Sequence, residues 1–262
     1  MTKNSSIRRA RKRLSLVPLF ALTLAAGVVG AVVARAERDP TPGSSNREAL
    51  LPRQTLADIP DPKQTGGESE SIVQVANLVY AGVKSSHCFS DHFLVTAEQD
   101  SAISTSRRFH AVKSGSEELF NFPLVIMTGE GTFQLTDAER QNLRQYVERG
   151  GFLLASAGCS SQEWNRAFRK EMATIFPRQP LTPLSMDHAL FNMVYEIKQL
   201  DARHGKPRPL EGISLGGRLG VVYSQDGLND TAHTQGCCCC GGNEITNCIQ
   251  VNVNILAYAL VH

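Results

Sequence analysis

Short apolar runs alternate with helical patterns along most of this sequence, and this alternation restricts the possible folds more than any other feature. The apolar runs lie at residues 72–82, 109–112, 122–128, 152–156, 210–215 and 219–223. Near-continuous apolar runs of this length are typical of strands that are buried on both faces of a sheet. Strands that alternate with helices predict an α/β fold, a three-layer domain with a mostly parallel sheet.

The best-defined helix is expected directly after the third apolar run. Thr136 and Glu139 have the spacing of a capping box, which begins a helix. Leu143 and Val147 then fall on one helical face, and the glycines at 150–151 end the pattern. The sequence therefore predicts a helix from Thr136 to the glycine pair.

A second helix is predicted over residues 162–176, before Pro177. Its large apolar residues recur every three or four positions, which indicates a face packed against the sheet rather than a cofactor-stacking surface; they are Trp164, Phe168, Met172 and Ile175. Residues 245–262 mix a period of two with a period of three to four, so the pattern allows either a final helix or a strand.

The first 36 residues have the layout of an export leader. They hold seven basic and no acidic residues, and no charge interrupts residues 14–34. Ala34 and Ala36 supply the small residues that signal peptidase needs, which predicts a signal peptide cleaved after Ala36. The alternative is an uncleaved signal anchor, because a helix of about 20 apolar residues spans a bilayer. In both cases we expect the remaining chain to be exported to the periplasm or cell envelope, or anchored to the inner membrane.

The next segment, residues 37–70, is rich in Pro, Gly, Ser and charge and predicts a flexible linker before a folded domain at 71–262. The leader contains seven of the 27 basic residues and none of the 25 acidic ones, so the rest carries 20 basic against 25 acidic residues. A nucleic-acid-binding protein needs a basic face. The composition therefore predicts no nucleic-acid partner, and leaves the membrane or envelope proteins as expected partners.

Candidate ligand-binding residues lie in the loops that follow the predicted strands. The carboxyl ends of parallel strands meet at one edge of the sheet, where ligands bind. Cys88 follows the first strand, and Gly129, Glu130 and Gly131 follow the third. Glycines let a backbone approach a ligand closely, although a solvated turn would give the same pattern. The sequence has no P-loop, no His-Glu-x-x-His and no Gly-x-Gly-x-x-Gly after a strand.

Cys159 lies on the predicted turn between the fourth strand and its helix, with the small residues Ala157 and Ser161 two positions to either side. A nucleophile elbow has this arrangement, and a helix N-terminus lowers a thiol pKa. A buried structural thiol is the alternative interpretation. If Cys159 is catalytic, His188 is the candidate base, and the amides of residues 158–160 would stabilise an oxyanion.

Four consecutive cysteines form the second unusual feature, and three interpretations remain open. They could pair as disulfides with Cys88, Cys159 and Cys248, since export favours oxidised cysteines. They could instead bind a zinc-like metal, completed by His233 or His188, or form a redox-active loop. The candidate metal ligands are Cys237, Cys238, Cys239 and Cys240.

Four stretches carry a resemblance to a known family. They are "FNFPLVIMTGEGTFQLTDAERQNLRQYVERGGFLLASAGCSSQEWNRAFRKEMATIFP", "LTPLSMDHALF", "LEGISLGGRLGVVYSQDGLND" and "VNVNILAYAL". In this order they resemble the bacterial family called domain of unknown function 4159, from about residue 72 to the C-terminus. The resemblance implies a flavodoxin-like fold similar to class I glutamine amidotransferases, with Cys159 at the position of their nucleophile.

The sequence departs from those amidotransferases because it lacks their His-x-Glu pair, so we do not expect glutaminase activity. Relatives in the resembling family are often envelope proteins with membrane segments, which agrees with the leader. The leading hypothesis is thus an exported or membrane-anchored envelope protein whose amidotransferase-like domain is a ligand-binding or metal-binding module. The alternatives are a Cys159-dependent hydrolase or transferase, and an assembly component with no ligand.

Overall fold

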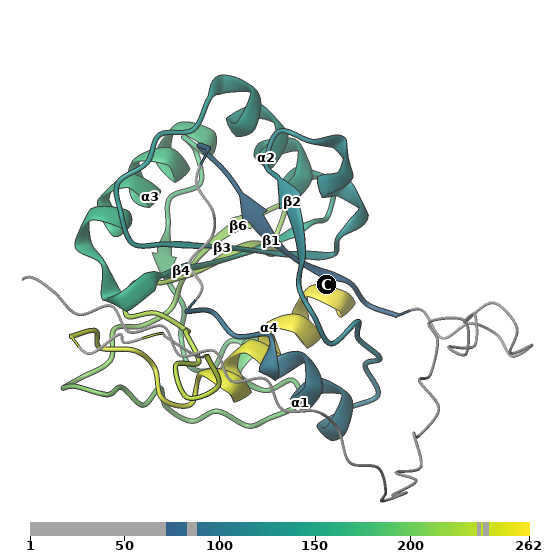
Figure 1. Cartoon of the computed structure of the whole chain (residues 1–262), viewed down its shortest axis with the longest axis vertical. Coiled ribbons are helices and arrows are strands. Elements are labelled where there is room, and N and C mark those ends of the chain that lie inside the picture. Colours follow the sequence, from purple (N-terminus) through teal and green to yellow (C-terminus); the bar gives the residue numbers. More distant parts are fainter. Residues whose placement is uncertain (1–71, 83–87, 235–236, 238–240) are drawn as a thin grey trace, which may run out of the picture. The chain divides into compact units, whose positions relative to one another are not determined.

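Among the residues that the structure describes, seven strands form the mixed sheet at the centre of the fold, in the order β2-β1-β3-β4-β7-β6-β5 (Figure 1). Strands β2, β1, β3, β4 and β7 are parallel, while β6 is antiparallel to both of its neighbours. The bounds are β1 Val75–Val79, β2 His110–Lys113, β3 Leu124–Gly129, β4 Phe152–Ala157, β5 Thr182–Pro183, β6 Glu211–Leu215 and β7 Arg218–Ser224. The predicted α/β class with a mostly parallel sheet is confirmed.

The computed structural model describes residues 72–82, 88–234, 237 and 241–262. The predicted leader at 1–36 with its apolar run at 14–34, the predicted linker at 37–70, and Cys238, Cys239 and Cys240 lie outside the described residues. No helix within the described ranges is long and apolar enough to cross a membrane.

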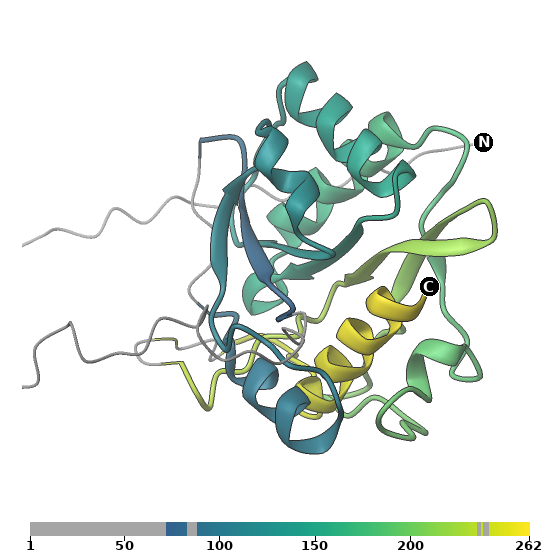
Figure 2. The ribbon, with the colours of Figure 1, turned by 90° about the vertical axis from the view of Figure 1, so that its right-hand side faces the viewer.

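In the described part of the chain, four α-helices cover the two faces of the sheet, which gives the predicted three layers (Figures 1 and 2). Helices α2 (Asp137–Glu148) and α3 (Gln162–Ile175) pack on one face, and α1 (His92–Asp100) and α4 (Cys248–Val261) on the other. Short 3-10 turns also occur, namely η3 Glu117–Asn121, η4 Gly158–Ser160 and η5 Ala189–Phe191. The sequence did not predict α1, because its helical face carries few large apolar residues.

Two elements differ from a simple reading of the apolar pattern. The runs at 210–215 and 219–223 are too close for a parallel crossover, and they form a hairpin whose turn has positive φ at Gly216 and Gly217. The ambiguous C-terminal segment is a helix, α4. Its residues from Val251 to Tyr258 are all buried, so apolar side chains occur on every face and no single helical stripe can be recognised.

Helix α2 begins with the predicted capping box. The Thr136 hydroxyl accepts a hydrogen bond from the Glu139 amide at 3.3 Å, and the Glu139 carboxylate accepts one from the Thr136 amide at 2.8 Å. The same carboxylate accepts bonds from the Ala81 amide at 2.8 Å and the Ser114 hydroxyl at 2.7 Å. Burial raises the pKa of Glu139, but these hydrogen bonds outweigh it and the net pKa is lowered. Glu139 therefore joins the start of α2 to the ends of β1 and β2.

The aromatic stripe of α3 lies in the core, which confirms its predicted packing role. Trp164 is 1% exposed and stacks on Phe168 with 5.0 Å between ring centroids. Its indole nitrogen donates to the Tyr80 hydroxyl at 2.7 Å, which in turn donates to the Thr128 carbonyl at 2.9 Å. Burial raises the pKa of Tyr80 to about 12. These bonds hold the ends of β1 and β3 against α3.

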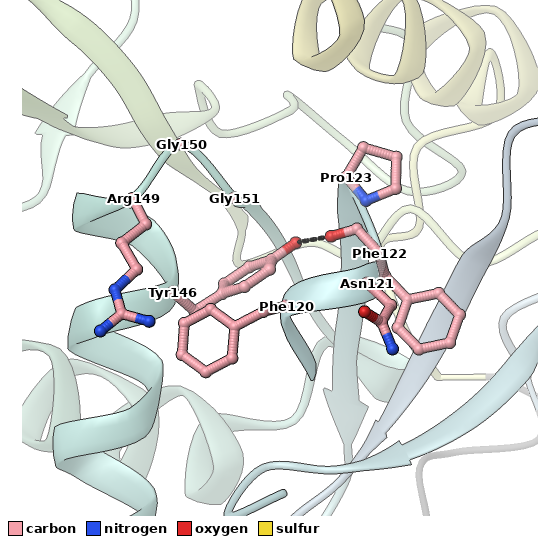
Figure 3. Close-up of a pocket in the computed structure, with 8 residues that line it drawn as sticks. All are labelled: Phe120, Asn121, Phe122, Pro123, Tyr146, Arg149, Gly150 and Gly151. Carbon is pink, nitrogen blue, oxygen red and sulfur yellow. Dashed lines mark hydrogen bonds between the residues drawn. The ribbon is translucent and has the colours of Figure 1, made fainter. Parts of the chain in front are cut away.

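A cavity of about 490 Å³ lies where β3 and β4 begin, at the amino edge of these strands (Figure 3). Tyr146 lines this cavity, and its hydroxyl donates a hydrogen bond to the Phe122 carbonyl at 2.9 Å. The Arg149 guanidinium lies 4.8 Å from the centre of the Phe120 ring. Gly151 is required here, because a Cβ would lie 2.3 Å from the Tyr146 ring. Of the predicted site residues that the structure describes, none lines this cavity.

Candidate functional site

The chain reverses its direction across the sheet between β1 and β3. From β1 it proceeds outward through α1 to β2, and from β3 it proceeds the other way through α2 to β4. Loops at the carboxyl ends of two such strands diverge and leave a crevice, which is the usual ligand position in open α/β sheets. Cys88 follows β1, Glu130 follows β3 and Cys159 follows β4.

The structure brings these three side chains together. The Sγ atoms of Cys88 and Cys159 and a carboxylate oxygen of Glu130 all lie within 4.8 Å of one another, and Cys159 Sγ is 3.6 Å from Glu130 Oε1. We call this group the Cys-Glu centre. In a tetrahedral zinc site, bonds of roughly 2.0–2.3 Å place ligand atoms about 3.5 Å apart. Two sulfurs and an oxygen at this spacing could hold such a metal.

The cysteines of the centre are oxidised in this structure. Cys88, Cys159 and Cys237 are all disulfide-bonded. Cys88 pairs with Cys237, with 5.4 Å between their Cα atoms. A disulfide sulfur carries no proton, so the contact between Cys159 Sγ and Glu130 is not a thiol hydrogen bond. Of the three interpretations of the cysteine run, pairing is the one found at Cys237, whereas Cys248 is a free thiol.

Cys159 has the backbone conformation of an elbow. Its φ and ψ are 50° and 33°, and Ser160 follows with a φ of 53°. A left-handed non-glycine residue costs about 1–3 kcal/mol and persists only where the surroundings hold it. The Ser160 hydroxyl supplies this restraint, because it donates to the Asp226 carbonyl and accepts from the Asn243 amide, both at 2.7 Å. The β4–α3 turn is thereby tied to the loop after β7.

The glycines around the centre have different roles. A Cβ on Gly158 would lie 2.9 Å from the Glu130 side chain, so this glycine lets the carboxylate lie against the elbow. A Cβ on Gly129 would lie 2.6 Å from the Tyr80 hydroxyl, which shows that core packing requires Gly129. Gly131 faces open space, with nothing within 4 Å of a Cβ.

His188 lies away from the Cys-Glu centre. It caps η5 by accepting from the Leu190 amide at 3.2 Å, and its ring is 5.5 Å from that of Tyr258 near the end of α4. Tyr258 packs on Phe152 at the start of β4, which is the amino edge of the sheet. Burial and the nearby His262 lower the pKa of His188. The structure therefore does not bring this histidine to Cys159.

His233 lies at the carboxyl edge, but in an arrangement that the sequence did not indicate. Its Nδ1 is 2.6 Å from Asp230 Oδ2, and its ring stacks on His92 with 3.9 Å between centroids. His92 begins α1 four residues after Cys88, and His233 precedes Cys237 by four. The ring stack and the disulfide thus both connect the start of α1 to the loop after β7.

Sequence reasoning also missed a group of buried polar residues after β7. Asp226, Asn229, Asp230 and Glu244 are at most 6% exposed. The sequence does contain a signal for this group, because a polar stretch at 225–230 directly follows an apolar run. The strand-end argument, extended to the last strand, would have located it.

A search of curated proteins found no match to this chain. The family model described as Domain of unknown function (DUF4159) matches residues 75–260, which include every described strand and the first 13 residues of α4. This match covers most of the sequence and confirms the resemblance seen in its motifs. The chain belongs to this family of domains of unknown function.

Proposed function

We propose that this chain is an exported envelope protein whose amidotransferase-like domain binds a zinc-like metal at the Cys-Glu centre when its cysteines are reduced. The observation that carries the proposal is the convergence of Cys88, Glu130 and Cys159 from three separate strand-end loops to within 4.8 Å. Two thiolates and a carboxylate are ligands that zinc prefers, and three protein ligands leave a fourth position for water or substrate.

The disulfide makes metal binding depend on redox state. Cys88 and Cys159 are both disulfide-bonded, so both must be reduced before they can bind zinc. For each bond, the phosphine supplies two electrons, each sulfur gains one proton from water, and the phosphine becomes a phosphine oxide. Zinc binding then displaces the thiol protons, because the thiolate is the ligand. The oxidised chain should bind zinc weakly at this centre, since a disulfide sulfur is a poor ligand.

The test is a zinc titration of the purified full chain against a chromophoric chelator, with and without phosphine. We expect zinc binding only after reduction, and a loss of affinity of at least tenfold in Glu130→Gln and in Cys159→Ser. The matched controls are Glu148→Gln, which changes an exposed carboxylate on α2, and Cys248→Ala, which removes a free thiol. If Glu130→Gln and Cys159→Ser keep the affinity of the parent, zinc binds at other cysteines, for example those at 237–240, and the proposed centre is wrong.

Export is supported by the leader at 1–36 and by the disulfides, because disulfides persist mainly outside the cytosol. Mass spectrometry of the chain from fractionated cells tests it. A chain that starts at Glu37 indicates a cleaved signal peptide, and an intact N-terminus in the membrane fraction indicates an anchor. A soluble cytosolic chain with its first 36 residues would contradict export.

The elbow at Cys159 favours a second candidate, a Cys159-dependent hydrolase or transferase. A left-handed turn before a helix is how such enzymes present a nucleophile, and Glu130 rather than His188 is the acid-base group in contact with the sulfur. Iodoacetamide alkylation of the reduced chain at neutral pH is the test. A Cys159 thiol that reacts no faster than glutathione would contradict this candidate.

A further inference from the structure

A small polar cavity lies behind the loop that follows β7, on the side of α4. Its volume is about 210 Å³, and its lining includes Arg203, Asn229, Asp230, Glu244 and Cys248. Cavities for drug-sized ligands measure roughly 300–1,000 Å³, so an occupant of this one must be smaller. The cavity is separate from the Cys-Glu centre, since none of that centre's residues lines it.

Two side chains that line this cavity are almost fully buried and have no hydrogen-bond partner among the residues that the structure describes. Glu244 and Asn229 are each 2% exposed, and within those residues neither oxygen of the carboxyl group nor either polar atom of the amide is hydrogen-bonded. Burial raises the pKa of Glu244, and the nearby Arg203 charge and Asn229 amide offset this only in part. The carboxyl group and the amide do not reach hydrogen-bond geometry with each other. An unpaired buried amide costs about 1–3 kcal/mol and an unpaired carboxylate more. A ligand that supplies the missing hydrogen bonds would remove this cost.

The surrounding backbone holds these two residues in place. The Leu228 amide donates to Ser156 Oγ at 2.8 Å and its carbonyl accepts from Asn252 at 3.1 Å. The Ile245 amide donates to the Gly227 carbonyl at 3.0 Å. Collapse of the cavity would break these bonds to β4 and α4, so the site is preformed.

The charges around the cavity indicate what it binds. Glu244 and Asp230 are carboxyl groups, and burial raises the pKa of Cys248 to about 12, so the thiol adds no negative charge. Arg203 is exposed and spends one donor on Thr231 at 3.0 Å, which leaves guanidinium donors for an anion. A ligand that fits has a cationic donor at one end and an anionic acceptor at the other.

We propose that this cavity binds a small zwitterion of the α-amino acid class, with its ammonium group at Glu244 and Asn229 and its carboxylate at Arg203. The ammonium group supplies donors to the unpaired carboxylate and amide oxygens. The carboxylate takes the bidentate geometry that a guanidinium offers. The proposal does not depend on metal binding at the Cys-Glu centre.

Calorimetric titration of the oxidised full chain tests the proposal, with alanine, propylamine and propionate as probes. We expect alanine to bind at least tenfold more tightly than either singly charged probe. Glu244→Gln should weaken alanine binding at least tenfold, and Arg203→Gln at least threefold. Glu148→Gln and Arg178→Gln, which change exposed residues of the same types, should have no effect.

Thermal unfolding distinguishes a variant that no longer binds alanine from a variant that no longer folds. Glu244→Gln removes an unpaired buried carboxyl group, so its midpoint without ligand should not fall below that of the parent, whereas its alanine-dependent rise should disappear. The proposal is overturned if alanine neither binds nor raises the midpoint, or if Glu244→Gln binds alanine like the parent. Binding of calcium alone, lost in Glu244→Gln, would identify a cation site and also overturn it.

Discussion

Removal of the Cys88–Cys237 disulfide should destabilise this fold strongly. The bond closes a loop with a sequence separation of 149 residues. By the loop-closure relation, a cross-link of this span lowers the conformational entropy of the unfolded chain by an amount equivalent to about 5 kcal/mol. Because Cys159 is also disulfide-bonded, part of that entropy is already lost. We therefore expect Cys88→Ser/Cys237→Ser to reduce the free energy of unfolding by about 3–5 kcal/mol.

The assay is urea denaturation of the full chain, followed by tryptophan fluorescence from Trp164, which is buried in the core. The double variant should unfold at lower urea. Its m-value should rise, since an unfolded chain without the cross-link exposes more surface. Phosphine should reduce the stability of the parent at least as much as the double substitution does.

Cys248→Ala is the matched control, because Cys248 is buried but not disulfide-bonded. Its effect should be equal in oxidising and reducing buffer. A loss below about 1 kcal/mol in the double variant, with an unchanged m-value, would refute the reasoning, because a cross-link of this span cannot then constrain the unfolded chain.

Three further substitutions test the packing of Gly129 and the hydrogen bonds at the start of α2. Gly129→Ala should cost about 1–3 kcal/mol by overpacking, since its Cβ would lie 2.6 Å from Tyr80 and 2.7 Å from Trp164; thermal unfolding measures this. Thr136→Ala should cost about 1 kcal/mol through loss of the cap, seen in urea titrations. Glu139→Gln should cost about 1–2 kcal/mol at neutral pH. The pKa of Glu139 is lower in the folded state than in the unfolded state. Its contribution to stability is therefore fully present above the unfolded-state pKa of 4.5 and is lost as the pH falls from there through the folded-state pKa. The variant should thus match the parent in strong acid, and an equal difference at every pH would contradict this.

Local patterns in the sequence were sufficient for the elements that depend on local chemistry. The capping box at Thr136 places the start of α2, because a cap is formed by residues three apart. The buried runs at 122–128 and 152–156 identify β3 and β4, which lie next to each other in parallel register. Strand-end reasoning then placed Glu130 and Cys159 at one edge, because all parallel strands end on the same side of a sheet.

The tertiary structure alone decided which distant groups meet. Pairing of Cys88 with Cys237 and stacking of His92 on His233 depend on where the loop after β7 folds back onto α1, and no local pattern specifies that path. His188 shows the reverse case, since a plausible base lies at the opposite edge of the sheet. That Glu244 has no hydrogen-bond partner among the described residues depends on its neighbours in space and not on its neighbours in sequence. Contacts between distant residues are set by the summed packing of the whole sheet and its helices, so sequence spacing cannot specify them.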